Sequence, residues 1–287
     1  MASDKSTRYV TYIDAGGASR PGILSGESVQ RIDMPTMREY IALSPERREA
    51  THTDEYVELR DVRLDAPVRP LRNVFCVGRN YLEHAKEGAA IFGKELKLPD
   101  VPTFFTKAPT AIVGPDWTVH LEAHVSKEYD FEAELAVVIG TRCKDVSEGE
   151  AMSVIFGYAA FNDVTARDLQ RAHLQWFKGK SLDETAPIGP CIVDTNGIPD
   201  PHALSIGFRL NGLQKQHSST GKMIFRIPRL IAELSKGMTL EPGDVIATGT
   251  PEGVGFARKP PEFLKDGDVM EVDIQTIGVL RNAVSIK

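Results

Sequence analysis

The chain has 287 residues, of which 41% are hydrophobic, and it carries a net charge of −6 at pH 7. Basic and acidic residues are mixed along the sequence without a basic run, which argues against a nucleic acid or an anionic membrane as partner. The cysteines, Cys76, Cys143 and Cys191, are scattered and form no C-x-x-C pair, so neither a disulfide framework nor a zinc knuckle is expected.

The sequence shows no sign of secretion or membrane insertion. Residues 1–5 lack the apolar core of a signal peptide, and no later segment approaches the length of a membrane span. We therefore expect a soluble, cytoplasmic protein.

Two domains are predicted. The proline-containing stretch 67–70 is the predicted boundary between a small N-terminal β-rich domain, residues 1–69, and a larger domain, residues 70–287.

Strands outnumber helices in the predicted elements and do not alternate with them regularly, which argues against a Rossmann fold or a TIM barrel and favours a β-rich α+β protein. Asn80 is a candidate cap for one predicted helix, and Gly88 is a candidate end for it. In chain order we expect a strand at 9–13, a turn at 14–17, a helix near 36–43, a strand at 74–77, and helices at 80–90, 165–173 and 228–236.

Glu132 and Glu134 stand two residues apart, directly before the apolar, β-branched segment 135–139. Because side chains alternate across a strand, both carboxylates are expected on one face with Ala136 and Val138. Two adjacent carboxylates that enter a core repel each other and lose hydration, and a proton or a hard divalent cation would offset that cost. A solvated face on an edge strand explains the same spacing equally well.

His84 and Glu87 lie three residues apart in a predicted helix, so they share one face of it. A carboxylate beside an imidazole orients the ring and raises its basicity, which makes the pair a candidate general base. The alternative, favoured on local grounds alone, is an exposed helix with solvated charges.

Asp163 follows an apolar strand, where it could supply a third oxygen ligand beside Glu132 and Glu134, or merely cap a helix. Arg167 is a candidate carboxylate clamp or a surface residue. Lys180 lies in G-K-S, which lacks the upstream glycine of a P-loop, so it is either a side chain of an enclosed site or an exposed lysine. The glycine-rich segment 248–255, which includes Thr250, could hold a small anion or be a simple turn.

Together these segments resemble the fumarylacetoacetate hydrolase family, and they follow one another in order over nearly the whole stretch from Val74 to Val284. The matching motifs are G-R-N-Y-x-x-H-x-x-E, F-x-x-K-x-P-T, D-F-E-x-E-L-A-V-V-I-G, N-D-V-T-A-R-D-L-Q, W-x-x-x-K with P-I-G-P, N-G-x-x-x-Q, M-I-F-x-I-P, P-G-D-V-I-A-T-G-T-P-E-G-V-G and G-V-L-R-N.

The resemblance implies a mixed β-sheet roll flanked by short helices, usually paired as a homodimer. It implies Mg²⁺ or Mn²⁺ held by Glu132, Glu134 and Asp163, and a water-activating dyad of His84 and Glu87. The positions that contact substrate in similar proteins are Lys180, Arg167, Gln170 and Thr250.

Members of this family act on 2-oxo acids or their enols. The leading expectation is a hydrolase of the acylpyruvase type, which cleaves a C–C bond of a 2,4-dioxo acid and releases pyruvate or a similar 2-oxo acid in the breakdown of aromatic compounds or sugar acids. In that reaction His84, oriented by Glu87, would activate water, and Lys180 would stabilise the oxyanion. The alternatives are an oxaloacetate-type decarboxylase, an enol–keto isomerase, and a keto-acid binding protein without turnover.

Overall fold

The computed structural model describes residues 6–91, 93 and 95–287. Residues 1–5, on which the expectation of no signal peptide rests, lie outside the described part. Among the described residues no helix is both long and apolar enough to cross a membrane. The chain is rich in strands with a few short helices, which confirms the predicted β-rich α+β class.

Most strands join one mixed sheet, which is twelve-stranded in the described residues. Two short strands extend it to the side: β5 (Arg63–Asp65) pairs with β1, and β8 (Ile112–Val113) pairs with β14. The order of the main path is β4 (His52–Glu58), β3 (Ser28–Ile32), β2 (Ser19–Ser25), β1 (Arg8–Ile13), β14 (Ala186–Asp194), β12 (Ile155–Asn162), β11 (Ala133–Ile139), β17 (Val245–Ala247), β6 (Val74–Gly78) and β7 (Thr103–Lys107).

A second sheet packs against the middle of the first. Leu135 and Val137 of β11 share one hydrophobic core with its inward-facing residues, and Phe131 stacks on Phe208 with ring centroids 4.2 Å apart. A separate pair joins β10 (Tyr129–Asp130) to β13 (Thr165–Ala166). The order of the second sheet is β16 (Leu213–Ser219), β15 (Ser205–Leu210), β18 (Val269–Ile274), β19 (Gly278–Ile286) and β9 (Val119–Leu121).

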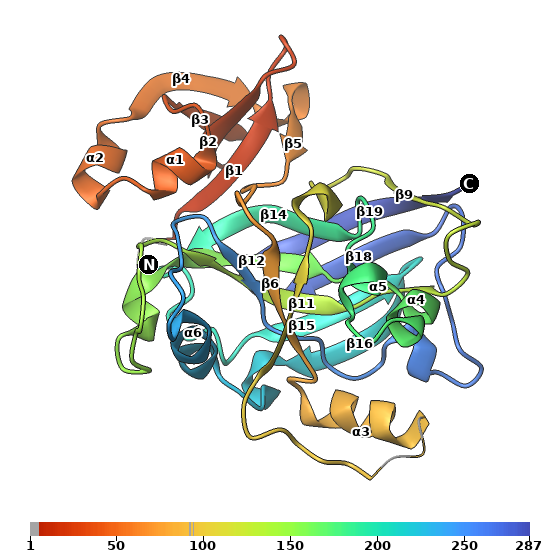
Figure 1. Cartoon of the computed structure of the whole chain (residues 1–287). Helices are drawn as coiled ribbons and strands as arrows, with labels where there is room; N and C mark the ends of the chain where they lie inside the picture. The colour runs from red at the N-terminus through yellow and green to blue at the C-terminus, as the bar shows by residue number, and fades with distance from the viewer. Residues whose placement is uncertain (1–5, 92, 94) are drawn as a thin grey trace.

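Strands β1 to β5 form a unit with the short helices α1 (Met37–Ile41) and α2 (Pro45–Glu49) at one end of the molecule (Figure 1). The unit is continuous with the large sheet because β1 pairs with β14. The ring of Tyr9 also lies 4.8 Å from that of Phe156 on β12. The proposed domain boundary at 67–70 falls between β5 and β6 and stays a prediction.

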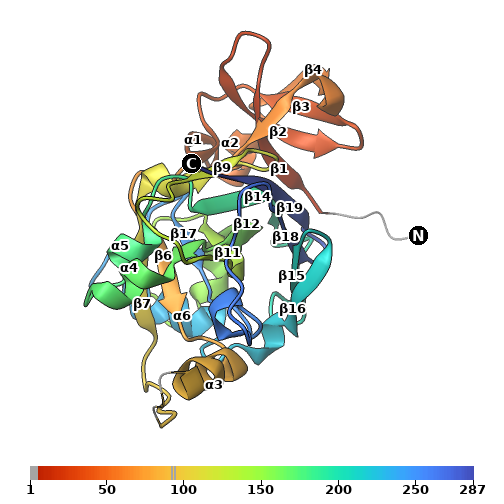
Figure 2. The ribbon, with the colours of Figure 1, turned by 90° about the vertical axis from the view of Figure 1, so that its right-hand side faces the viewer.

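The remaining helices are α3 (Leu82–Ile91), α4 (Arg167–Ala172), α5 (Phe177–Lys180) and α6 (Ile227–Ser235). Helix α3 lies at the end opposite the N-terminal unit, as both views show (Figures 1 and 2). Two predicted details of α3 are wrong. The helix continues past Gly88 to Ile91, and the Asn80 side chain is hydrogen-bonded to Phe225 and to the Thr248 carbonyl instead of capping α3.

Strand β11 is central, paired with β12 on one side and β17 on the other, and all seven of its residues are buried. Its alternation directs Leu135 and Val137 toward the second sheet, while Ala136 and Val138 join a core on the opposite face. Glu134 therefore lies on the face of Ala136 and Val138, as predicted. The alternative of a solvated edge strand is wrong.

The first turn of α6 depends on a histidine from a distant loop. Its N-cap residue, Arg226, makes no side-chain cap, and the backbone N–H of Ile227 donates instead to Nε2 of His202 at 3.1 Å. Burial lowers the pKa of His202, and the nearby Arg226 shifts it in the same direction. His202 is thus held in the neutral form that can accept this hydrogen bond.

Because the folded-state pKa of His202 lies below its ordinary value of 6.5, the unfolded chain binds more protons as the pH falls through that value. We therefore expect the free energy of unfolding to decrease below about pH 6.5, by about 1 kcal/mol once His202 is protonated. Urea unfolding at pH 7.5 and 5.5 measures this change. His202→Gln, which keeps an acceptor but cannot titrate, should reduce the pH dependence, whereas the exposed His217→Gln should leave it intact. An equal pH dependence in both variants would contradict the assignment.

Candidate active site

Three carboxylates predicted from two separate motifs meet at the start of β11. Glu132 directly precedes β11, Glu134 is the second residue of that strand, and Asp163 directly follows β12. One oxygen from each lies within 4.8 Å of those of the other two, and all three side chains are buried. The structure thus brings together a triad that could hold a metal ion.

Two buried lysines contact this triad. Lys180, at the end of α5, donates from Nζ to Glu132 Oε2 at 2.8 Å and to Asp163 Oδ2 at 2.7 Å. Lys107, at the end of β7, donates to Asp163 Oδ1 at 2.7 Å and to the Val164 carbonyl at 2.9 Å. Burial lowers the pKa of Lys107, whereas for Lys180 the adjacent carboxylates outweigh burial and raise the pKa. Asp163 therefore lies between two ammonium groups.

Arg167 is a buried ion-pairing residue, and its interpretation as a surface residue is wrong. Its guanidinium lies 2.6 Å from Glu132 Oε1 and 2.8 Å from Asp130 Oδ2, donates to Gln170 Oε1 at 3.0 Å, and stacks over the ring of Phe256. Although burial alone would raise the pKa of Glu132, Lys180 and Arg167 lower it below its usual range.

Glu134 differs from the other two carboxylates because, among the described residues, it makes no ion pair. Its Oε2 accepts a hydrogen bond from the Gly249 N–H at 2.8 Å. Burial raises the pKa of Glu134 well above its usual range, and the carboxylates of Asp163 and Glu132 add to the effect. A positive charge is therefore missing beside Glu134.

The donor set fits a hard divalent cation such as Mg²⁺ or Mn²⁺. All three ligand groups are carboxylates, which these ions prefer, and each carboxylate oxygen has a second lone pair beyond the one that accepts from a lysine or arginine. Counting Asp130, four buried carboxylates face only the three cationic side chains of Lys107, Lys180 and Arg167. A cation would supply the missing charge.

The backbone N–H groups of the glycine-rich segment after β17 bind carboxylate side chains of the protein itself. Gly249 donates to Glu134, Gly253 donates to both oxygens of Glu87 at 3.0 and 3.2 Å, and Gly255 donates to Asp130 Oδ1 at 2.7 Å. The sequence left open whether this segment holds a small anion or is a simple turn. In the structure its N–H groups are occupied by carboxylates of the chain. Thr250 Oγ1 accepts a hydrogen bond from Gln216 Nε2 at 2.9 Å.

His84 and Glu87 lie on the same side of α3, as their spacing predicts, while Glu83 and Lys86 on that helix are exposed and paired with each other. His84 Nδ1 lies 3.6 Å from Glu87 Oε2, slightly beyond hydrogen-bond distance, and this buried nitrogen has no other partner among the described residues. The backbone of Gly253 fixes the carboxylate of Glu87, which lies beside the imidazole.

A cavity of about 530 Å³ opens onto these groups. Its lining residues come from the end of β6, α3, the segment 95–99, helix α4 and α5. Glu87 and Asp163 are not among the lining residues. The predicted site residues that line it are His84, Glu132, Glu134, Arg167, Gln170, Lys180 and Thr250.

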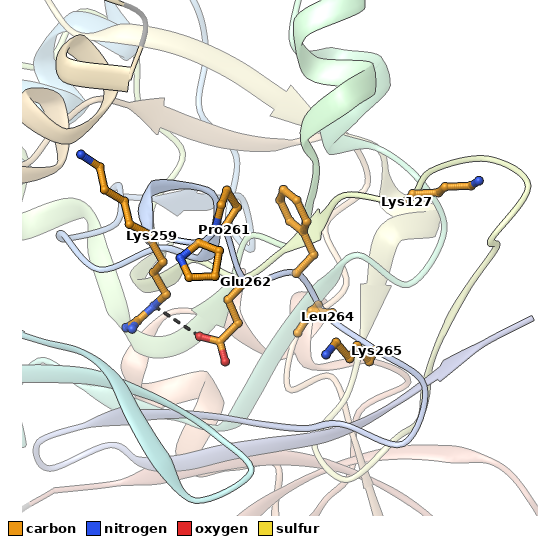
Figure 3. Close-up of a pocket in the computed structure, with 9 residues that line it drawn as sticks. Lys127, Lys259, Pro261, Glu262, Leu264 and Lys265 are labelled. Carbon is orange, nitrogen blue, oxygen red and sulfur yellow. Dashed lines mark ion pairs between the residues drawn. The ribbon is translucent and has the colours of Figure 1, made fainter.

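A second cavity, of about 780 Å³, has a different character (Figure 3). Lys127 and the segment 258–265 line it, and none of the predicted site residues does. Its carboxylate, Glu262, is already neutralised by Lys215 at 2.6 Å and by Arg258 at 3.5 Å. The acid–base groups therefore belong to the smaller cavity.

The sequence interpretation missed four residues that the site uses. Lys107, Asp130, Asn80 and Gln216 each lie inside a matching motif, but none was assigned a role in the site, and Asn80 was considered only as a helix cap. A lysine at the end of the otherwise uncharged strand T-F-F-T-K was the clearest available signal, because a lone buried cation needs a carboxylate partner.

Comparison with known proteins identifies the family. Residues 73–285 match the family described as "Fumarylacetoacetate (FAA) hydrolase C-terminal". The chain is 46% identical over 227 residues to oxaloacetate tautomerase YisK of Bacillus subtilis (strain 168), a match that covers 79% of this chain and 74% of that protein. The chain therefore belongs to the fumarylacetoacetate hydrolase family, whose members act on keto acids.

Solved structures support the same fold. A fumarylacetoacetate hydrolase from Exiguobacterium antarcticum is 38% identical with a TM-score of 0.84, and the match covers 98% of this chain and 100% of that one. A 2-hydroxyhepta-2,4-diene-1,7-dioate isomerase from Mycobacterium marinum is 35% identical with a TM-score of 0.80, covering 98% and 99%. These likenesses confirm the resemblance and the fold inferred from the motifs.

If the triad holds a divalent ion, Mn²⁺ should raise the thermal unfolding midpoint, because a ligand at about 100 times its Kd adds about 2.7 kcal/mol of stability. Glu134→Gln should abolish this increase. The same variant should be more stable than the parent without metal, since it removes a buried charge that repels its neighbours. Thermal scans with Mn²⁺ and with chelator measure both effects, and the exposed Glu27→Gln is the control. A full Mn²⁺ response in Glu134→Gln would remove Glu134 from the ligand set.

Proposed function

We propose that the protein is a divalent-metal-dependent enol–keto isomerase that acts on a 2-oxo dicarboxylic acid of the oxaloacetate type. The observation that carries the choice of reaction is the 46% identity to a protein named oxaloacetate tautomerase. This similarity supports the isomerase alternative better than the hydrolase that led the sequence interpretation.

The triad of Glu132, Glu134 and Asp163 would hold Mg²⁺ or Mn²⁺. Such an ion supplies a Lewis acid that polarises the 2-oxo group and eases proton loss from the neighbouring carbon. Lys107 and Lys180 orient the carboxylate of Asp163 through ion pairs, and Arg167 orients that of Glu132.

His84 is the proposed proton carrier. The carboxylate of Glu87 beside Nδ1 favours the tautomer with its proton at Nδ1, which leaves Nε2 free to exchange a proton with the substrate. In the enol-to-keto direction the enol hydroxyl loses a proton and the adjacent carbon gains one. The reaction neither consumes water nor changes oxidation state, so one acid–base residue beside the cavity is sufficient.

The lining of the cavity supports an anionic substrate. Lys180, Arg167 and Gln170 offer N–H donors to the cavity, and Thr250 offers a hydroxyl. Ordered donors of this kind bind carboxylate and oxo oxygens. The homodimer and the cytoplasmic location expected from the sequence remain predictions.

A second candidate is the hydrolysis of a 2,4-dioxo acid. The 38% identity to a fumarylacetoacetate hydrolase over almost the whole chain supports it. The same His84–Glu87 pair that moves a proton could also activate water, and oxaloacetate decarboxylation could begin from the same bound substrate. Reaction products distinguish the three.

The proposal predicts that the protein accelerates loss of the enol absorbance of oxaloacetate with Mg²⁺ or Mn²⁺, beyond the rate with metal alone, and that chelator removes the effect. His84→Ala should lower kcat by about 100-fold or more, because loss of a general acid–base group typically costs at least this much. Lys86→Gln is the matched control, since Lys86 is exposed on the same helix and outside the cavity.

Pyruvate and CO₂ are followed in parallel with oxaloacetate, acetylpyruvate and fumarylpyruvate as substrates. Tautomerisation without either product supports the isomerase. Pyruvate from a dioxo acid without CO₂ would replace it by the hydrolase, and CO₂ from oxaloacetate would replace it by the decarboxylase. Undiminished turnover in His84→Ala would disprove the assignment of the proton carrier.

A further inference from the structure

Arg79 is a cationic residue of the active-site cavity that lacks a carboxylate partner. Three other cations of the same cavity, Arg167, Arg171 and Lys180, are ion-paired with carboxylates of the chain. Arg79 makes no ion pair or hydrogen bond with any described side chain. An unpaired guanidinium that lines a cavity is suited to bind an anionic group of a ligand.

The backbone of Arg79 is in a conformation that disfavours its own side chain. Strand β6 ends at Gly78, and Arg79 follows with a φ of 57°. The left-handed region costs a residue with a Cβ about 1–2 kcal/mol, whereas glycine adopts it freely. An arginine at such a position points to a use for the side chain that compensates for this strain.

Trp176 orients the Arg79 side chain. The guanidinium carbon lies 5.5 Å from the centroid of the indole ring, within range of a cation–π contact. The indole also packs directly on Gly78, where an added Cβ would come within 2.3 Å of it. Both aromatic and cationic groups line the cavity, so the stacked guanidinium is preorganised at its wall.

Contacts of the neighbouring residue connect Arg79 to the proposed metal site. The next residue, Asn80, donates to the Thr248 carbonyl at 2.8 Å, and its Cβ lies so close to Gly249 that an added Cβ there would come within 2.8 Å. Gly249 in turn donates to Glu134. The end of β6 is therefore held against the same loop that holds a carboxylate of the triad.

We propose that Arg79 is a specificity-determining residue that binds the second carboxylate of a dicarboxylic substrate whose 2-oxo acid end lies at the triad. This inference rests on the proposed function for the orientation of the substrate, and it deepens that function by naming the group that distinguishes dicarboxylic from monocarboxylic oxo acids. A planar guanidinium matches a carboxylate with two parallel hydrogen bonds.

Lys97 is the matched comparison within the chain. It lines the same cavity and has no ion pair among the described residues, but it is exposed, lies in the irregular segment 95–99 and has no stacking partner that would orient it. A flexible ammonium loses more side-chain entropy when it binds an anion than a stacked guanidinium does.

The test compares the binding of malate with that of lactate, which lacks the second carboxylate, by calorimetry in the presence of Mn²⁺. The parent protein should prefer malate. Arg79→Gln should weaken malate binding about tenfold, the equivalent of one charge-assisted contact, and should leave lactate binding unchanged. Lys97→Gln should preserve the preference for malate.

Arg79→Gly is the second variant, because glycine keeps the left-handed backbone while removing the side chain. Its thermal midpoint should equal or exceed that of the parent, and it should lose the malate preference as Arg79→Gln does. Loss of the preference in Lys97→Gln but not in the Arg79 variants would overturn the proposal, as would an equal loss of malate and lactate binding in both Arg79 variants.

The binding assay requires no turnover, so its outcome is separable from that of the proposed function. A malate preference that depends on Arg79 supports the inference even where oxaloacetate is not isomerised. Conversely, efficient isomerisation with no effect of Arg79→Gln on the KM for oxaloacetate would overturn the inference and leave the proposed function intact.

Discussion

The structure depends on a group of carboxylates buried at the centre of the large sheet. Glu132, Glu134 and Asp163 are buried and close together, so their negative charges repel one another and need compensation by cations or protons. Lys107 and Lys180 enter from the ends of two separate elements to compensate part of this charge. The positions of β7 and α5 relative to the central strands are thus tied to the electrostatics of the site, and the uncompensated remainder beside Glu134 makes a divalent cation the natural completion.

The loop after β17 connects the carboxylate triad to the helix that carries the proposed acid–base residue. Its backbone N–H groups bind Glu134 on the central strand and Glu87 on α3, so one short segment connects the floor of the site to the helix that carries His84. A glycine at 249 or 253 adopts a positive φ there, which a residue with a Cβ would resist. The backbone of this loop thus fixes both a carboxylate of the triad and the carboxylate that lies beside the imidazole of His84.

Local sequence patterns correctly predicted those site residues whose positions depend on the strand that carries them. The two-residue spacing of Glu132 and Glu134 placed both on one face, and the end of an apolar strand placed Asp163 beside them. Lys107 could not be assigned in this way, because it reaches the site only through the pairing of Val74 with Lys107 and then of β6 with β17, contacts between segments far apart in the chain. Gly88 misled for a related reason: helix propensity favours an end there, but nothing in the tertiary structure requires one.

The cavity has two kinds of lining that we expect to serve different purposes. The floor is the group of buried, charged residues at the triad, which are paired with one another. A substitution in the floor is expected to disturb both the fold and any chemistry that begins with a 2-oxo acid. Isomerisation, decarboxylation and C–C hydrolysis share these requirements, so the floor cannot distinguish them. The wall, by contrast, is formed by exposed residues such as Arg79 and Lys97 that carry few packing contacts. Substitutions of such exposed residues are expected to change which distal group is bound at little cost in stability, whereas substitutions of the buried groups are expected to change both binding and stability.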